Sequence, residues 1–203
     1  FTLIGIFISI FLTLLILEVG LNFFPVNEGL RSQAVNEKNP IFRFEAYRKA
    51  IYSKHWNFDL QNQVKVNNYG FINDHDYNNS SKKPLLSIIG DSYVEALMVP
   101  FKQTISGLLH NEASDRRVYS FAASGAGLSQ HLIWAKYAKE EFNSDYFIFV
   151  IIANDFMESL SQYGSSPGFH RFKFNKDKSW SMELANYNPS LIRKILRRSK
   201  LAM

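Results

Sequence analysis

The chain has 203 residues, with 23 Lys and Arg against 18 Asp and Glu, no Cys, and 46% hydrophobic residues. This length suits one ordinary domain with an appendage, and the hydrophobic content excludes a globally disordered chain. Without Cys there can be no disulfide scaffold, no Cys-ligated metal and no Cys nucleophile. Five basic residues lie within 193–200, and removing them from 23 leaves 18, equal to the number of acidic residues. The body of the chain is therefore neutral, which argues against a nucleic-acid partner.

The segment Phe1–Phe24 predicts a transmembrane anchor. It carries a single charge, Glu18, close enough to one end to reach the membrane interface. As a helix it would be roughly 36 Å long at ~1.5 Å per residue, which is enough to cross a bilayer. A secretory signal peptide has a shorter apolar run and a small-residue cleavage site, and a core helix is rarely apolar all round. Both alternatives fit less well than an anchor.

Residues 25–83 are mixed and polar with scattered aromatics, and they predict a connector that packs on the main domain. Within it, 64–72 alternates enough to predict a short strand with a turn at 68–70. The following segment, 74–84, is rich in Asn, Ser and Lys and predicts a solvated loop. We place the main domain at 84–203.

From residue 85 the hydrophobic pattern changes to strand, helix, strand, helix, strand, over residues 85–89, 104–113, 118–122, 129–142 and 146–152. Ser129 is a plausible N-cap of the second helix. Continuous apolar strands that alternate with helices predict a parallel sheet covered on both faces. The run 146–152 is the most apolar of the three strands.

Two further elements follow the sheet. Residues 169–184 predict a β-hairpin with its turn at 175–178, and 190–203 predicts a basic amphipathic helix. We expect this helix to pack on the domain, with a membrane-surface helix as the alternative.

Polar residues follow each of the three parallel strands. Gly90-Asp91-Ser92 follows the first, Ser124-Gly125-Ala126-Gly127 the second, and Ala153-Asn154-Asp155 the third. The carboxyl ends of parallel strands meet at one edge of a sheet, where ligands bind in such folds. Acyl transfer needs a nucleophile and donors for the oxyanion. Ser92 would supply the hydroxyl, Gly125 a backbone N–H and Asn154 a side-chain amide. Each tripeptide alone is an ordinary turn, and their joint placement carries the argument.

The segments IIGDSYVEA, VYSFAASGAGLSQ and FVIIANDF resemble the first three motif blocks of the SGNH (GDSL) hydrolases, and NNYGFI resembles a motif that precedes the nucleophile strand in membrane-anchored members. The resemblance covers about 85–156. It implies a flavodoxin-like α/β/α fold and an esterase or acyltransferase activity. It places the nucleophile on Ser92, the oxyanion glycine on Gly125 and the amide donor on Asn154.

The chain departs from the family pattern in three places. Ala153 stands where a Gly commonly precedes the Asn, and Ser120 stands where the second block often has an Asn. The fourth block, an Asp-x-x-His that supplies the general base and its orienting acid, is not found. Among the histidines, we expect His170 on a loop or hairpin surface, His110 and His131 facing solvent, and His75 at the rim of the site. The fifth histidine of the chain is His55.

We therefore expect the sheet to be incomplete and the chain to continue past Met203, with the base encoded there. The resulting hypothesis is a hydrolase of the cell envelope, held in the cytoplasmic (inner) membrane by a single transmembrane helix, with its catalytic domain on the outer, periplasmic side. Its substrate would be an ester-bearing glycan, a lipid or a small acyl ester. No cofactor and no metal are expected. The alternative is a catalytically incomplete envelope protein that acts as a glycan-binding or assembly module.

Overall fold

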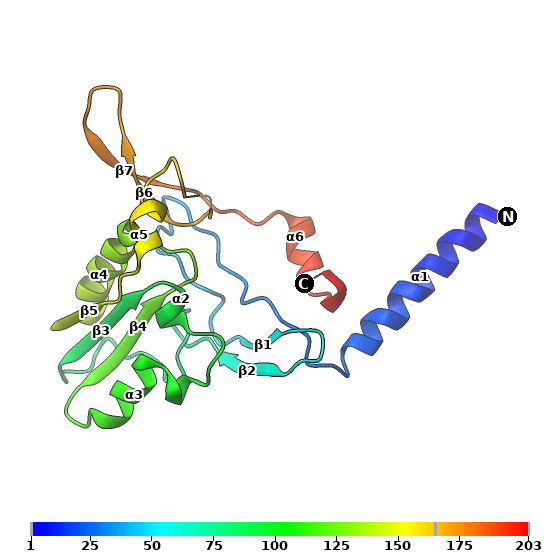
Figure 1. Cartoon of the computed structure of the whole chain (residues 1–203), viewed down its shortest axis with the longest axis horizontal. Helices are drawn as coiled ribbons and strands as arrows, with labels where there is room; N and C mark the ends of the chain where they lie inside the picture. The colour runs from blue at the N-terminus through cyan, green and yellow to red at the C-terminus, as the bar shows by residue number, and fades with distance from the viewer. Residues whose placement is uncertain (1, 165, 203) are drawn as a thin grey trace.

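The computed structural model describes residues 2–164 and 166–202. Figure 1 shows one long helix, α1 (Thr2–Leu21), that projects from a mixed α/β domain. The domain is built on a three-stranded parallel sheet in the order β4-β3-β5. These strands are β3 (Leu85–Gly90), β4 (Arg117–Ala122) and β5 (Tyr146–Phe149). The predicted parallel sheet with its three strands in this region of the chain is confirmed.

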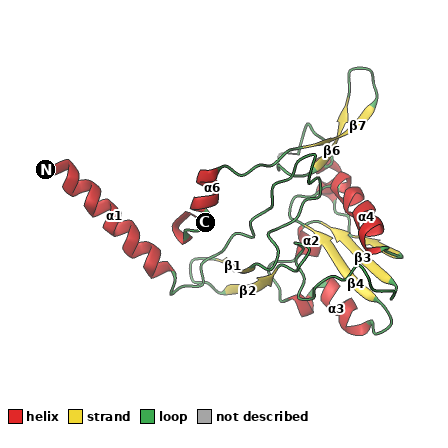
Figure 2. Cartoon of the chain, turned by 180° about the vertical axis from the view of Figure 1, so that it is seen from behind, coloured by secondary structure: helices red, strands yellow, loops and turns green. Residues whose placement is uncertain are grey.

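The central strand, β3, is buried along its whole length, because helices cover both faces of the sheet. Leu85 and Ile89 point to the face covered by α4 (Leu128–Phe142). Leu86 and Ile88 point to the face covered by α3 (Ile105–Glu112), where they meet Leu109. This alternation is the period of two that a β-strand imposes on its side chains. Figure 2 shows α3 and α4 on either side of the sheet.

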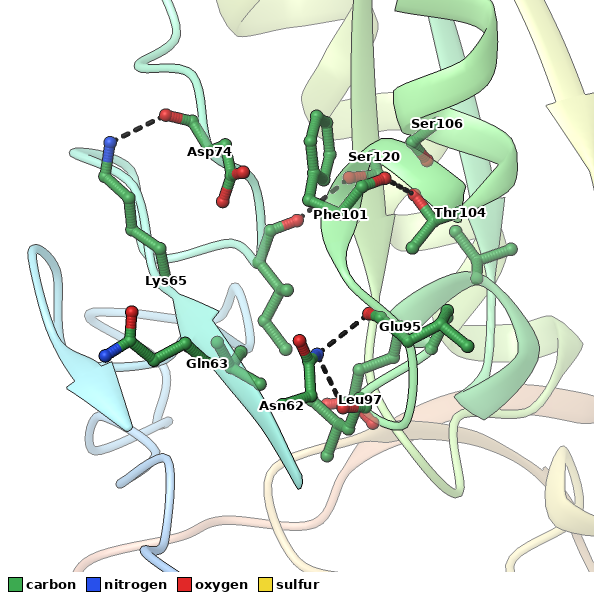
Figure 3. A pocket seen from close by; sticks show the side chains of 15 residues that line it. Asn62, Gln63, Lys65, Asp74, Glu95, Leu97, Phe101, Thr104, Ser106 and Ser120 are labelled. Atoms are coloured by element: carbon green, nitrogen blue, oxygen red, sulfur yellow. Dashed lines mark hydrogen bonds between the residues drawn. The ribbon is translucent and has the colours of Figure 1, made fainter. Parts of the chain in front are cut away.

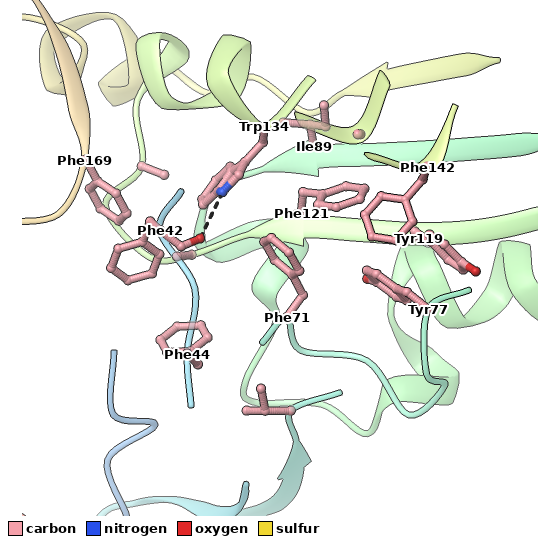
Figure 4. Packing of buried hydrophobic residues seen from close by; sticks show 14 of the residues in the cluster. Phe42, Phe44, Phe71, Tyr77, Ile89, Tyr119, Phe121, Trp134, Phe142 and Phe169 are labelled. Atoms are coloured by element: carbon pink, nitrogen blue, oxygen red, sulfur yellow. Dashed lines mark hydrogen bonds between the residues drawn. The ribbon is translucent and has the colours of Figure 1, made fainter. Parts of the chain in front are cut away.

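The larger core cluster is aromatic and lies between the sheet and α4 (Figure 4). Trp134, Ala138 and Phe142 recur at intervals of four residues, so they form one buried stripe of α4. Leu132, on another face of the same helix, is half exposed. The indole N–H of Trp134 donates to the carbonyl of Phe42 at 3.2 Å, which ties α4 to the connector.

The connector does more than cover the domain, since it supplies about a third of this cluster. Its contributions are Val35, Phe42, Phe44, Val66, Phe71 and Tyr77. It also contains an antiparallel hairpin that the sequence did not predict, β1 (Lys49–Lys54) with β2 (Leu60–Lys65).

The NNYGFI segment forms a tight turn that closes against this connector. The buried Asn67 accepts hydrogen bonds from the backbone N–H groups of Tyr69 and Phe71, both at 3.0 Å. Gly70 has a φ of +84°, and a Cβ there would lie 2.5 Å from the Phe44 carbonyl oxygen. Only glycine fits such a position without strain. The predicted turn at 68–70 is confirmed, although the strand before it ends at Lys65.

One sequence-based detail of the domain is wrong, the N-cap of α4, and the inward face of α3 is a finding of the structure. Helix α4 begins at Leu128 with Gly127 as its N-cap, so Ser129 lies inside the helix, where its hydroxyl donates to the His170 carbonyl at 2.7 Å. Helix α3 turns Ser106 and Gly107 inward and leaves Leu108 exposed, because its close approach to the preceding segment admits only small side chains.

The third strand, β5, is an edge strand, and it ends at Phe149, short of the apolar run 146–152. Tyr146 and Phe149 are 55% and 39% exposed, and Ile151 just beyond the strand is 50% exposed. β5 pairs with β3 on one side, and no described strand pairs with its other side.

The end of the chain is less compact than expected. The predicted hairpin is confirmed as β6 (His170–Phe174) and β7 (Trp180–Leu184), with its turn at 175–178. The predicted final helix is two short pieces, α6 (Leu191–Leu196) and the 3₁₀ turn η2 (Lys200–Ala202), and neither has a buried residue. The expectation that this segment packs through its apolar side chains on the domain is wrong.

Helix α1 is long and apolar enough to cross a membrane, with a mean hydropathy of 2.5 and none of its length buried. It is also separate from the domain in Figures 1 and 2, as the sequence predicts. Its described link to the rest of the chain is Glu18, whose carboxylate accepts hydrogen bonds from the segment 199–201.

Candidate functional site

Ser92 is the first residue of α2 (Ser92–Glu95), directly after β3, and its side chain is exposed. The buried carboxylate of Asp91 caps this one-turn helix, accepting from the Tyr93 N–H at 3.0 Å and from the Ser92 hydroxyl at 3.2 Å. The turn is so tight that a Cβ on Gly90 would lie 2.4 Å from a methyl of Val94. Glycine, aspartate and serine therefore each have a structural reason to stand here, and the result is an exposed hydroxyl at the carboxyl end of the central strand.

Gly125 lies in the loop between β4 and α4 with a φ of +79°. Its neighbour Ser124 has its N–H engaged, because it donates to the Glu95 carboxylate at 2.9 Å. The Ser124 hydroxyl donates to the same carboxylate oxygen. Within the described residues the N–H groups of Ser92 and Gly125 have no hydrogen-bond partner. These two N–H groups are therefore free to donate to a bound oxyanion.

Asn154 is the second residue of α5 (Ala153–Glu158), which follows β5, and its side chain is exposed. The next residue, Asp155, turns inward instead and accepts from the Ile152 N–H at 2.8 Å, which caps the helix. Since β3, β4 and β5 run parallel side by side, Ser92, Gly125 and Asn154 lie at the same edge of the sheet. Their convergence on one point stays a prediction.

Beneath the exposed residues lies a group of buried carboxylates. Asp91, Glu95 and Asp155 are 1%, 4% and 0% exposed. Burial is the main cause that raises the pKa of Glu95, to about 7; the nearby charge of Asp91 raises it further, while the hydrogen bonds from Ser124 lower it. Burial and then the charge of Asp91 likewise raise the pKa of Asp155. Asp91 and Asp155 accept hydrogen bonds within their own turns, and Glu95 alone of the three reaches across to another loop, at Ser124.

Glu95 is the residue that sequence reasoning missed. Its side chain joins α2 to the loop that carries Gly125, so it fixes the distance between the serine and the glycine loop. The available signal was a carboxylate four residues after Asp91 within an otherwise apolar turn, Val94 and Ala96 being its neighbours. A buried acid in that position needs a partner.

The described contacts of the histidines are with residues other than Ser92. His131, expected to face solvent, is 1% exposed on the inner side of α4, and burial lowers its pKa while the charge of Asp91 opposes this. His75 stacks on His110, with ring centroids 3.9 Å apart, and so it packs on α3. His170 lies beside the Gln130 amide oxygen at 3.2 Å. Among the described hydrogen bonds, none joins a histidine to Ser92.

Two hollows flank Glu95. A cavity of about 20 Å³ lies between β2 and the α2–α3 segment. The Asn62 amide there donates to the Leu97 and Val99 carbonyls, both at 2.8 Å. Figure 3 shows the side chains that line it. The cavity has room for roughly one water molecule. A wider depression of about 360 Å³ lies on the other side, next to Ser124. Its walls include Phe42, Phe169, Arg193 and Arg197.

In the described part of the chain, no group of three or more His, Asp or Glu side chains is arranged to hold a metal ion. Comparison of the chain with family models, curated proteins and solved structures finds no match.

Proposed function

We propose that this chain is a membrane-anchored serine esterase or O-acyl hydrolase/transferase of the SGNH (GDSL) type. The observation that carries the proposal is an exposed serine hydroxyl at one edge of a parallel sheet, together with the backbone N–H groups of Ser92 and Gly125, which have no partner among the described residues. The strand order supports it too. If the three parallel strands are numbered in chain order, their order in the sheet is 2-1-3. A flavodoxin-like sheet has the order 2-1-3-4-5, which begins in the same way.

In the proposed reaction the Ser92 Oγ attacks the ester carbonyl and its proton passes to a general base. The carbonyl oxygen becomes an oxyanion that the N–H groups of Ser92 and Gly125 and the amide of Asn154 stabilise. Collapse breaks the ester C–O bond, the base returns the proton to the leaving alcohol, and the acyl group stays on Ser92. If water then attacks the acyl-enzyme and releases the acid, the protein is a hydrolase. If a second alcohol attacks it and takes the acyl group, the protein is a transferase.

The proposal needs a base, since a serine hydroxyl without one is a weak nucleophile. The Ser92 hydroxyl donates its described hydrogen bond to Asp91, the carboxylate that caps α2, and not to a histidine base. We assign the base to the Asp-x-x-His block that the family resemblance implies, outside residues 1–203. The membrane role of α1, the outward orientation of the domain in the cytoplasmic membrane and an ester-bearing envelope glycan, lipid or small acyl ester as substrate belong to the same proposal.

The test is hydrolysis of nitrophenyl acetate by the full-length protein in detergent micelles. Ser92→Ala is expected to remove most of the activity, because it removes the nucleophile. Ser114→Ala, an exposed serine after α3, is the matched control and is expected to leave activity unchanged. Wild-type activity in Ser92→Ala would refute the serine mechanism.

The hydrogen bond from Ser92 to Asp91 is the specific observation that favours the second candidate, a non-catalytic envelope module that binds glycans or assembles with partners. In that case the depression beside Ser124 would be the binding surface. Full-length protein that hydrolyses no ester but binds an envelope glycan in a manner that depends on Arg193, an exposed residue of the wall, would support this candidate over the enzyme.

A further inference from the structure

The C-terminal segment Leu191–Ala202 presents apolar and basic side chains together on its surface. Leu191, Ile192 and Ile195 are 74%, 70% and 61% exposed, values far above those of an amphipathic helix that packs on a domain. The same segment has no acidic residue and carries five basic ones, which are Arg193, Lys194, Arg197, Arg198 and Lys200.

This segment is fixed at the base of α1. The Glu18 carboxylate, near the C-terminal end of α1, accepts from the Ser199 hydroxyl at 2.7 Å and from the Lys200 N–H at 2.8 Å. Lys200 also pairs with Glu28 in the stretch just after α1, at 3.6 Å. Figure 1 shows α6 on the side of the domain that faces α1. Where α1 leaves a bilayer, α6 is therefore held beside the bilayer surface.

We propose that Leu191–Ala202 is a membrane-surface segment that inserts its leucines and isoleucines at the interface and binds anionic lipid headgroups through its basic side chains. Basic side chains flanking exposed apolar ones are the composition of interfacial helices. Anionic headgroups attract basic side chains, and each such side chain near the surface raises the ratio of bound to free segment about fivefold. Docking would give the domain a second attachment and so a fixed orientation over the bilayer. The proposal rests on α1 being the anchor and is independent of Ser92.

The position and the charge of the segment favour a lipid bilayer over a protein as its partner. A protein partner could cover the same side chains, but the contacts with Glu18 and Glu28 hold the segment at the base of α1, where a bilayer crossed by α1 would be its neighbour. The side chains of Arg193, Lys194 and Arg198 make no described hydrogen bond or ion pair within the chain, so they are available to headgroups.

The experiment uses the absence of cysteine from residues 1–203, and any cysteine outside them is replaced by Ser. Full-length Ile195→Cys protein carries an environment-sensitive fluorophore and is reconstituted in vesicles of phosphatidylcholine, alone or mixed with phosphatidylglycerol, with nitroxide-labelled lipids as quenchers. The same label at Leu12→Cys reports whether α1 is inserted. A label at Lys176→Cys, in the β6–β7 turn far from α1 in Figures 1 and 2, is the reference for a site in water.

We expect the label at 195 to be quenched in the mixed vesicles, more strongly than in phosphatidylcholine alone, and the label at 176 to stay unquenched. Replacing Arg193, Lys194 and Arg198 by Gln is expected to lower the bound-to-free ratio by up to about a hundredfold, at about fivefold per charge. The matched control replaces the exposed Lys82, Lys102 and Lys176 by Gln and is expected to have no effect.

Quenching at 12 without quenching at 195 would overturn the proposal while leaving the anchor intact. No quenching at 12 would overturn both. A label at 195 that is shielded in micelles in a concentration-dependent way, without lipid quenching, would identify a second protein chain as the occupant and refute a lipid surface.

Discussion

Replacing Glu95 by Gln tests whether burial of the carboxyl beneath the site destabilises its ionised form. Glu95 is 4% exposed, and its pKa rises from an ordinary value of 4.5 to about 7. Because the folded pKa lies above the unfolded one, the favourable contribution of the protonated carboxyl is fully present below pH 4.5 and is lost as the pH rises through about 7. At ~1.4 kcal/mol per pKa unit, the whole change is worth about 3 kcal/mol.

The glutamine variant keeps an acceptor for the Ser124 N–H but has no proton to lose. Between pH 5 and pH 8 the free energy of unfolding of Glu95→Gln should therefore rise relative to wild type by about 2.5 kcal/mol, since part of the titration precedes pH 5. Urea unfolding in detergent micelles, followed by tryptophan fluorescence, measures this difference at each pH. Glu112→Gln, at an exposed glutamate of α3, is the control and should show no such pH dependence. A difference for Glu95→Gln that stays constant between the two pH values would refute the reasoning.

Two further predictions use the same protein. Gly90→Ala should lower the free energy of unfolding by about 1–3 kcal/mol, because its Cβ would lie 2.4 Å from Val94 and overpack the turn before Ser92; urea unfolding measures this, and unchanged stability would contradict the tight turn. Asn154→Ala should reduce the esterase rate of the full-length protein by about 10²–10³-fold, the effect of losing one oxyanion donor. Asn111→Ala, an exposed asparagine of α3, is its control, and an unchanged rate in Asn154→Ala would remove that residue from the site.

The sequence predicted the parts of the fold in which local pattern and tertiary burial agree. Leu85–Gly90 is apolar and lies in the centre of the sheet, so its pattern and its place coincide. Tyr146–Phe149 has the same pattern, but its exposure depends on whether another strand pairs with it, which the pattern does not encode. Phe42 and Phe44 lie in an irregular segment without periodicity, so nothing local indicated that they complete the core.

The same distinction holds at the site. The positions of Ser92, Gly125 and Asn154 follow from the rule that parallel strands end at one edge, so the sequence placed them on that edge. The role of Glu95 depends on a contact with Ser124 across 29 positions of the chain, and no spacing rule gives such a contact. The burial of His131 depends on which face of α4 meets the sheet, and the aromatic stripe of Trp134 and Phe142 decides that face.

The central claim is that Ser92 carries the acyl group during turnover. The most direct measurement is to mix the full-length protein with an activated acyl ester, quench the reaction with acid within one turnover, and locate the acyl group by mass spectrometry of the peptide fragments. We predict acylation of the peptide that contains Ser92 at the serine itself, and loss of that modification in Ser92→Ala while the neighbouring Tyr93 stays unmodified in both. An acyl group found on another residue, or turnover of the ester without any acylated Ser92, would contradict the account.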